Sequence, residues 1–222
     1  GVEVSVANLG FIGLGIMGKP MAGHLIAAGH EVFLNSRSGV PEELKQAGKG
    51  TGKPCASVKE VAQNADVIFL MLPDTPDVEL VVAGSGGVLD TLAAGSVVID
   101  MSTIAPAAAR RLADRVRERG SAMLDAPVSG GEIGATNATL SIMVGAAPAL
   151  FERLRPYLAC MGTEVTHCGA VGAGAAVKLM NNMVVAQTVV ALAEALAVAR
   201  ASGAVDPEVL FRTLAKGSAD SF

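Results

Sequence analysis

The sequence predicts an α/β protein in which a doubly wound parallel sheet is followed by a long linking helix and the start of an all-α domain. Short apolar runs alternate with helical patterns over roughly the first 170 residues, as in a parallel sheet covered by helices on both faces. A glycine-rich turn joins the first apolar run to the first helical pattern. After Gly172 no strand pattern recurs, and Ala, Leu, Val and Glu dominate.

Each predicted strand is a short apolar run that ends at turn residues. A parallel strand is buried on both faces, so its apolar residues are continuous rather than alternating. Hydrophobic residues make up 51% of the chain but aromatic residues only 3%, which suits an aliphatic interior of this kind. The runs lie at 9–15, 31–35, 66–72, 96–101 and 122–127.

Helices are predicted between and after these runs. The first follows the glycine-rich turn and extends to about Ala28. Another covers 105–120, where Pro106 stands in the first turn, Gly120 lies past the end, and apolar and charged residues occupy opposite sides. Residues 173–200 contain no proline and predict a helix of roughly 40 Å, at about 1.5 Å per residue.

The C-terminal segment also carries helix punctuation. Gly203 is suited to end the long helix, and Asp206 with Pro207 is suited to begin another as N-cap and first helical residue. The chain ends at Phe222, shortly after this second helix begins, so we expect the helical domain to be incomplete.

Composition and charge exclude several classes of protein. Seventeen Lys and Arg against 21 Asp and Glu give a net charge of −4, which offers no basic face for nucleic acid. The most apolar long stretch, 183–199, is interrupted by Gln187, Thr188 and Glu194, so a buried helix is expected rather than a membrane span. No signal peptide pattern and no paired cysteine spacing occur, which favours the reducing cytoplasm.

A phosphate-binding turn is predicted at 13–18, where the sequence reads G-x-G-x-x-G between a strand and a helix. Gly13 permits the tight turn, Gly15 lets the backbone approach a pyrophosphate, and Gly18 allows close packing of helix on strand. The helix N-terminus supplies free N–H groups. The turn predicts a Rossmann dinucleotide site whose first segment consists of Gly13, Leu14, Gly15, Ile16, Met17 and Gly18.

The end of the second predicted strand indicates which dinucleotide is bound. NAD enzymes place Asp or Glu there to accept the ribose 2′-hydroxyl, but this chain has Ser36, Arg37 and Ser38. A guanidinium and two hydroxyls suit a 2′-phosphate, so NADP is expected. The alternative is that Arg37 stacks on adenine and that NAD is accepted as well. We therefore expect an NADP-binding domain over 1–170, and over 171–222 an interdomain helix with the beginning of a helical substrate and dimerisation domain.

Four segments, in order along almost the whole chain, resemble the β-hydroxyacid dehydrogenase family. They are GFIGLGIMGKPMAGHL (10–25), MLPDTPDVE (71–79), the stretch from DMSTIAP (100–106) through LDAPVSGGEIGA (124–135) to TLSIMVG (139–145), and GAVGAGAAVKLMNN (169–182). The chain departs from the family pattern at Ala138, which stands where a glycine usually precedes Thr139.

The resemblance implies roles for individual residues. Lys178 would be the catalytic general acid, with Asn182 one helical turn away to orient the substrate and the lysine. Ser129, Gly130 and Gly131 would bind the substrate carboxylate, and Thr103 would contact substrate and nicotinamide. Leu72 and Pro73 would lie beside the cofactor. No cluster of His, Cys, Asp or Glu has metal-ligand spacing, so no metal is expected.

The expected activity is therefore an NADPH-dependent reduction of a small 3-oxo acid. Within the family the segments look most like the members that reduce tartronate semialdehyde to glycerate. The alternatives are NAD-linked oxidation of 3-hydroxyisobutyrate, reduction of succinic or glyoxylic semialdehyde, and a non-catalytic dinucleotide-binding module. The presence of Lys178 and Asn182 favours an enzyme over that module. The resemblance also implies a homo-oligomer, a dimer or tetramer formed through the helical domain.

Overall fold

The computed structural model of the protein describes residues 8–45, 48–217 and 219. The predicted outer ends of the two domains, at residues 1 and 222, lie outside the described residues. By its internal contacts the chain divides into two units, Gly1–Lys178 and Leu179–Phe222, so the division falls within a helix.

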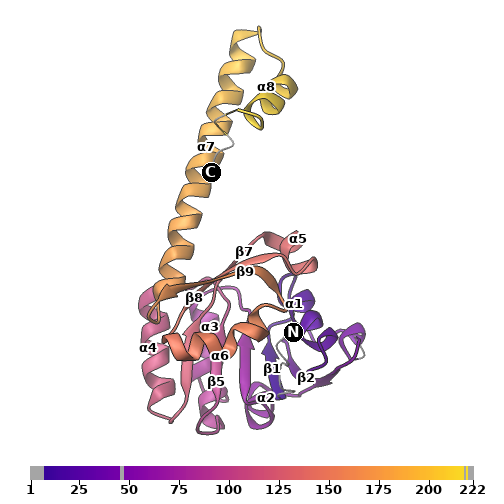
Figure 1. Ribbon diagram of the computed structural model, residues 1–222, viewed down its shortest axis with the longest axis vertical. Helices are drawn as coiled ribbons and strands as arrows, with labels where there is room; N and C mark the ends of the chain where they lie inside the picture. The colour runs from indigo at the N-terminus through magenta and orange to yellow at the C-terminus, as the bar shows by residue number, and fades with distance from the viewer. Residues whose placement is uncertain (1–7, 46–47, 218, 220–222) are drawn as a thin grey trace. The chain divides into compact units, whose positions relative to one another are not determined.

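The first unit is built on a nine-stranded sheet with the order β3-β2-β1-β4-β5-β6-β8-β7, and β9 pairs with β8 (Figure 1). The first six strands are parallel, whereas β8 runs antiparallel to β6 and β7. The predicted α/β class and the doubly wound Rossmann sheet are thus confirmed. The strands are β1 (Asn8–Ile12), β2 (Glu31–Asn35), β3 (Thr51–Pro54), β4 (Val67–Leu70), β5 (Val97–Asp100), β6 (Ala122–Asp125), β7 (Val128–Ser129), β8 (Leu140–Gly145) and β9 (Gly162–Gly169).

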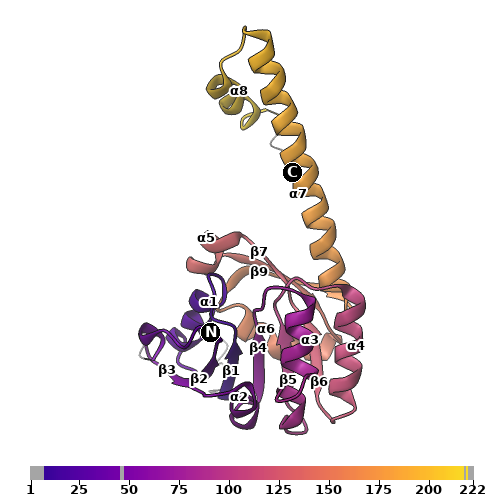
Figure 2. The same cartoon turned by 180° about the vertical axis from the view of Figure 1, so that it is seen from behind.

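Helices cover both faces of this sheet (Figures 1 and 2). Alternate side chains of each strand point to opposite faces, so one core forms beneath α1 and α6 and a second beneath α2, α3 and α4. In β4, for example, Phe69 packs in the first core and Ile68 in the second. The helices of the unit are α1 (Gly18–Ala27), α2 (Val58–Asn64), α3 (Thr75–Ala83), α4 (Pro106–Arg117), α5 (Gly131–Thr136) and α6 (Pro148–Leu158).

Several elements of the sheet have no counterpart among the predicted apolar runs. The strand β3 has the sequence TGKP, and β7 is only two residues long. The strand β9, GTEVTHCG, is polar and largely exposed. These strands form because neighbouring strands supply hydrogen-bond partners, a non-local contribution that leaves no apolar run in the sequence.

The long C-terminal helix is present as α7 (Ala173–Ser202), and α8 (Pro207–Leu214) follows it. Gly203 follows α7 with a φ of 62°, the left-handed conformation that favours glycine at a helix end. Asp206 caps α8, where its carboxylate accepts a hydrogen bond from the N–H of Glu208 at 2.7 Å. The predicted long helix and the predicted roles of Gly203 and Asp206 at the helix ends are therefore confirmed.

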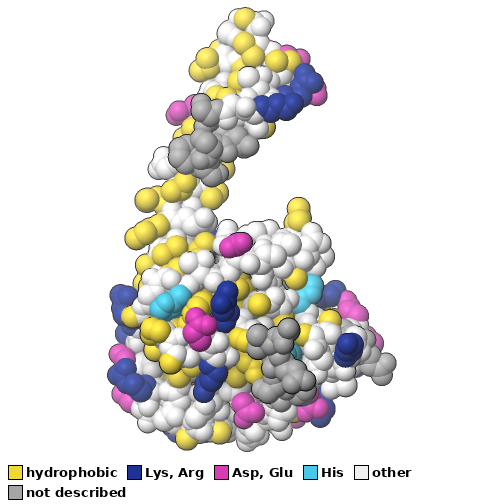
Figure 3. Space-filling model, in the orientation of Figure 1, with side chains coloured by type: hydrophobic (Ala, Val, Ile, Leu, Met, Phe, Trp, Pro, Cys, Tyr) yellow, Lys and Arg dark blue, Asp and Glu magenta, His cyan; other side chains and the backbone are white. Residues whose placement is uncertain are grey.

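The apolar stretch of α7, which the sequence predicts to be buried, is exposed among the described residues. Only 6% of the most apolar window of α7 is buried, and hydrophobic side chains gather along the helix (Figure 3). Among the described helices, α7 is the one long and apolar enough to cross a membrane by length and composition. In the described part of the second unit, the part of α7 beyond Lys178 is accompanied by the short α8, which buries none of its own residues, so little described surface is present to cover α7.

Ala138 adopts a left-handed conformation, with a φ of 55°, and is the one non-glycine residue in the described part of the chain to do so. A left-handed conformation destabilises an L-residue by about 1–2 kcal/mol, and glycine avoids this strain. Glycine also increases the entropy of the unfolded chain, which offsets part of the gain in stability. We expect Ala138→Gly to raise the free energy of unfolding by about 0.5–1 kcal/mol in denaturant titrations. As a control, Ala113→Gly within α4 should lower it by about 1 kcal/mol. A loss of stability in Ala138→Gly would contradict the prediction.

Candidate functional site

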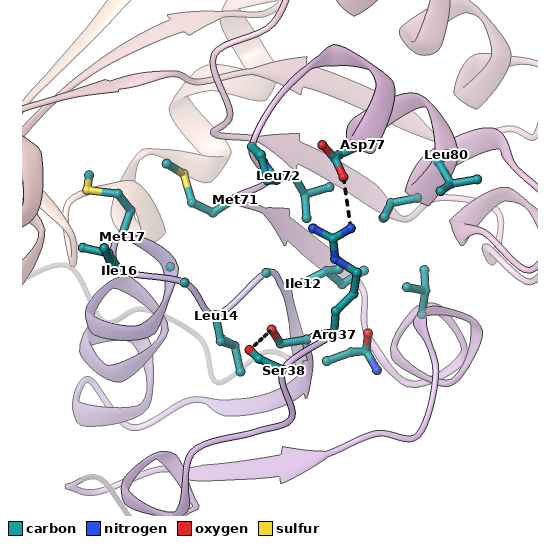
Figure 4. Close-up of a pocket in the computed structure, with 18 of the residues that line it drawn as sticks. Ile12, Leu14, Ile16, Met17, Arg37, Ser38, Met71, Leu72, Asp77 and Leu80 are labelled. Atoms are coloured by element: carbon teal, nitrogen blue, oxygen red, sulfur yellow. Dashed lines mark hydrogen bonds and ion pairs between the residues drawn. The ribbon is translucent and has the colours of Figure 1, made fainter.

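A cavity of about 560 Å³ opens at the carboxyl ends of β1, β2 and β4 (Figure 4). This is the edge at which doubly wound sheets bind ligands. The predicted cofactor residues all line it, namely Gly13, Leu14, Gly15, Ile16, Met17, Gly18, Ser36, Arg37, Ser38, Leu72, Pro73 and Thr103. Residues that were not predicted also contribute, namely Ile12, Asn35, Val58, Met71, Asp77, Leu80 and Val81.

Each glycine of the turn at 13–18 has a different environment. Gly13 has a φ of 97°, and a Cβ there would collide with the backbone oxygen of Met71. A Cβ on Gly18 would collide with the backbone oxygen of Gly13, so the start of α1 packs directly on the turn. A Cβ on Gly15 would meet nothing within 4 Å. The open space at Gly15, beside a helix N-terminus without a side-chain cap, fits a pyrophosphate that approaches the backbone closely.

The end of β2 supplies polar groups to one end of the cavity. The N–H of Gly13 donates to the backbone oxygen of Asn35 at 3.0 Å, which joins the glycine turn to this strand. Beyond it, the Ser36 and Ser38 hydroxyls lie 3.2 Å apart. The Arg37 side chain is 86% exposed, and its Nη1 lies 3.5 Å from Oδ1 of Asp77 on α3. A guanidinium and two hydroxyls fit a 2′-phosphate.

Two hydrogen bonds link the residues that follow β4 to those at the end of β5. The N–H of Leu72 donates to Oγ of Ser102 at 2.9 Å, and the N–H of Ser102 donates to Oδ1 of Asp100 at 3.0 Å. Asp100 is fully buried at the end of β5, and its Oδ2 has no partner among the described residues. Burial raises the pKa of the Asp100 carboxyl to about 7.

The raised pKa of Asp100 makes stability depend on pH. The pKa is near 3.8 for an ordinary aspartate and about 7 in the folded protein, so the folded state binds this proton more tightly. The stabilisation by protonation is therefore present at low pH and is lost as the pH rises through 7. Asp100→Asn mimics the protonated form, so we expect it to raise Tm more at pH 8 than at pH 5. The surface variant Asp66→Asn should show no such difference, and an equal effect of Asp100→Asn at both pH values would contradict the assignment.

The predicted carboxylate-binding segment lies in a different place from the cofactor cavity lining. Ser129 ends β7, and Gly130 and Gly131 follow with φ values of 128° and 60°. They lead into α5, which is held against α1 because Nε2 of His24 lies 2.9 Å from the backbone oxygen of Ala135. A second cavity of about 700 Å³ is lined by the glycine turn, α1 and α5. From α5, Glu132 and Thr136 line this second cavity together with Leu14, Gly15 and Ile16 of the glycine turn.

Lys178 is the last residue of the first unit, and the start of its helix is anchored to the sheet. Asp125, at the end of β6, accepts hydrogen bonds from the N–H groups of Gly172 at 2.6 Å and Ala175 at 2.7 Å. Burial raises the pKa of Asp125, whereas these N–H donors act to lower it. Lys178 is half-buried and does not line the cofactor cavity, and burial lowers its pKa. Asn182 belongs to the second unit, and its role stays a prediction.

Three aspartates at this edge were missed in the sequence. Asp100 and Asp125 are register partners at the carboxyl ends of β5 and β6, and Asp77 lies on α3. The signal for the first two was present, since an aspartate ends each apolar run at the edge where ligands bind. Asp77 gave no such signal, because an acidic residue in the first turn of a helix is common and favourable.

Comparison with known proteins agrees with this geometry. Residues 8–169 match the family model described as the NAD binding domain of 6-phosphogluconate dehydrogenase. Residues 172–222 match the model described as the NAD-binding of NADP-dependent 3-hydroxyisobutyrate dehydrogenase. The two matches meet at the start of α7 and together cover almost the whole chain.

Individual relatives are similar over the same length. The chain is 43% identical to 2-hydroxy-3-oxopropionate reductase of Escherichia coli (strain K12) over 214 residues, 96% of this chain and 72% of that protein. It is 40% identical to 2-(hydroxymethyl)glutarate dehydrogenase of Eubacterium barkeri, over 97% of this chain and 70% of that protein. Among solved structures, Mycobacterium tuberculosis 3-hydroxyisobutyrate dehydrogenase with L-serine has a TM-score of 0.83 at 36% identity, over 96% of this chain and 71% of that one.

These matches confirm the resemblance on which the sequence prediction relied. The two family matches together cover the glycine turn, the residues of the cofactor cavity and the Lys178 segment. The family descriptions also agree with the expected cofactor, NADP, and with NAD as its alternative. The chain belongs to the β-hydroxyacid dehydrogenase family of NAD(P)-dependent oxidoreductases.

Proposed function

We propose that the protein uses NADPH to reduce a small 3-oxo acid, and that its preferred substrate is tartronate semialdehyde, which yields glycerate. The observation that carries the proposal is the cofactor cavity, where an open glycine turn suits the pyrophosphate of NADPH and the Ser36–Arg37–Ser38 segment suits its 2′-phosphate. The choice of substrate is supported by the 43% identity to 2-hydroxy-3-oxopropionate reductase.

Bound NADPH supplies the hydride that reduces the aldehyde carbon. Lys178 then donates a proton from Nζ to the carbonyl oxygen as that oxygen gains negative charge, which completes the hydroxyl group. Because burial lowers the pKa of Lys178, its ammonium group is a stronger acid near neutral pH than an exposed lysine. Asn182, one helical turn further along α7, orients the substrate.

The substrate carboxylate binds to the segment after β7. Gly130 and Gly131 have left-handed backbone conformations, and consecutive N–H groups in such a turn form a concave anion site. The Ser129 hydroxyl adds a further donor. Thr103, which lines the cofactor cavity, contacts both nicotinamide and substrate. In this arrangement the carboxylate is recognised separately from the reacting carbonyl.

The proposal is tested by following NADPH oxidation at 340 nm with tartronate semialdehyde, and with succinic and glyoxylic semialdehydes for comparison. The reverse assay uses 3-hydroxyisobutyrate with NAD. We expect the highest kcat/KM for tartronate semialdehyde with NADPH. Preference for another semialdehyde, or for 3-hydroxyisobutyrate with NAD, would overturn the choice of substrate. NADPH binding without turnover of any of these compounds would identify a dinucleotide-binding module instead.

The assembly and the compartment are also proposals. We propose a homo-oligomer, a dimer or tetramer, that covers the exposed apolar side chains of α7 and α8, among them Met183, Val189 and Phe211. We propose the cytoplasm as its location, because the free cysteines Cys55, Cys160 and Cys168 suit a reducing compartment.

A further inference from the structure

Arg37 and Asp77 are the only ionisable residues that line the cofactor cavity in the described part of the chain. They face each other across its adenosine end, and Nη1 of Arg37 lies 3.5 Å from Oδ1 of Asp77 (Figure 4). The Asp77 side chain is 31% exposed and sits in the first turn of α3, whereas Arg37 comes from the loop after β2. The cavity lining therefore has no net charge, although the dinucleotide that it fits carries several negative charges.

We propose that Asp77 competes with the 2′-phosphate of NADPH for Arg37 and so limits the preference of this site for NADPH over NADH. The inference rests on the proposed function only in that Arg37 is taken to bind the 2′-phosphate. In this proposal the preference for NADPH over NADH depends on Asp77 of α3 as well as on the residues at the end of β2, which usually determine that preference.

The 2′-phosphate can displace Asp77 from Arg37 because the ion pair between the two side chains is weak. Exposed pairs of this kind contribute about 0–1 kcal/mol, and Arg37 is largely exposed, so its guanidinium can turn from the carboxylate to a phosphate. A phosphate with a charge of about −1.5 to −2 is the stronger partner. The Asp77 carboxylate then remains near the phosphate without its counter-ion, and this repulsion weakens NADPH binding. NADH, which has a ribose hydroxyl at that position, leaves the ion pair intact.

Removal of the Asp77 charge should therefore strengthen NADPH binding selectively. We expect Asp77→Asn to lower the Kd for NADPH by about two- to five-fold, the range expected for one partly exposed charge pair. The Kd for NADH should change less than about two-fold. The same selectivity should appear with 2′,5′-ADP compared with 5′-AMP, measured by calorimetry. These two ligands contain only the adenosine end, so the result does not depend on substrate or turnover.

A matched control is available on the same helix. Glu79 also lies on α3, but it pairs with Arg111 of α4 at 2.7 Å and does not line the cavity. Glu79→Gln removes the same charge from the same helix, and it should leave the ratio of the two Kd values unchanged. If Glu79→Gln strengthened NADPH binding as much as Asp77→Asn does, the effect would be one of net charge and the proposal would fail.

The role of Arg37 is tested by combining variants. Arg37→Ala should weaken 2′,5′-ADP binding and leave 5′-AMP binding nearly unchanged. In that background Asp77→Asn should strengthen 2′,5′-ADP binding less than it does in the wild type, because no guanidinium remains to be released. Weaker NADPH binding in Asp77→Asn alone would overturn the proposal, since Asp77 would then position Arg37 for the phosphate. Weaker NADH binding with unchanged NADPH binding would also overturn it and would identify Asp77 as a ribose acceptor.

The outcomes separate this inference from the proposed function. If no semialdehyde is reduced but Asp77→Asn strengthens 2′,5′-ADP binding, the substrate assignment fails and the selectivity inference stands. If tartronate semialdehyde is reduced but Asp77→Asn leaves the ratio of Kd values unchanged, the inference fails and the reductase assignment stands.

Discussion

Replacement of Lys178 by alanine is expected to lower kcat for reduction of the semialdehyde by about 10²–10⁴-fold, the usual contribution of a positioned general acid. The ammonium of Lys178 is the proton donor in the proposed reaction, and water is a poorer donor in its place. Because Lys178 does not line the cofactor cavity, the Kd for NADPH should stay within about two-fold of the wild type. The measurement combines stopped-flow reduction at 340 nm with direct titration of NADPH.

Two further variants sharpen this prediction. Lys178→Arg keeps the positive charge, but a guanidinium does not release its proton, so kcat should remain as low as in Lys178→Ala. This result would show that the positive charge of Lys178 is not sufficient for catalysis. Lys59→Ala removes a half-buried lysine whose Nζ lies 3.6 Å from Oδ2 of Asp90, and it should leave kcat unchanged. In the wild type, kcat should fall as the pH rises through the lowered pKa of Lys178, because only the protonated form donates. A Lys178→Ala enzyme with nearly full kcat would remove the lysine from the mechanism.

Gly15→Ala is expected to weaken NADPH binding by about 10–100-fold while the protein stays folded. The added methyl group meets no protein atom within 4 Å, so the stability of the free protein should change little. It occupies the space in which the pyrophosphate would approach the backbone of the turn. The effect should therefore appear in the Kd for NADPH and not in Tm measured without cofactor.

Gly18→Ala and Gly23→Ala serve as controls for Gly15→Ala, the first for loss of stability and the second for a harmless added methyl group. A methyl group at Gly18 collides with the backbone oxygen of Gly13, so this variant should lower the free energy of unfolding by about 1–3 kcal/mol. Gly23 lies within α1, and its nearest neighbour would be Cδ2 of Leu44 at 3.6 Å, so Gly23→Ala should bind NADPH normally and be slightly more stable. Unchanged NADPH affinity in Gly15→Ala would contradict the proposed position of the pyrophosphate.

The elements that could be predicted depend on neighbours in the sequence. The central strands, α1, α4, α7 and the glycine turn follow from apolar runs, helix periodicity and the backbone freedom of glycine, all of which act within a few residues. For this reason the doubly wound sheet, the cofactor edge and the identity of the turn residues were predictable. The polar edge strand β9 and the two-residue β7 depend instead on hydrogen bonds with β8, and no pattern of residues within either strand predicts them.

The same distinction between local and long-range interactions applies to the candidate site. The cofactor residues form contiguous short segments, whereas the contacts that tune them join residues far apart in the chain. Arg37 meets Asp77, Leu72 bonds to Ser102, and Asp125 holds the start of α7 some 47 residues later. Burial likewise arises only on folding, and it is burial that raises the pKa of Asp100 and lowers that of Lys178. The sequence therefore determined the fold and the chemical groups of the site, but the pairing and charge of those groups were decided by packing between distant segments.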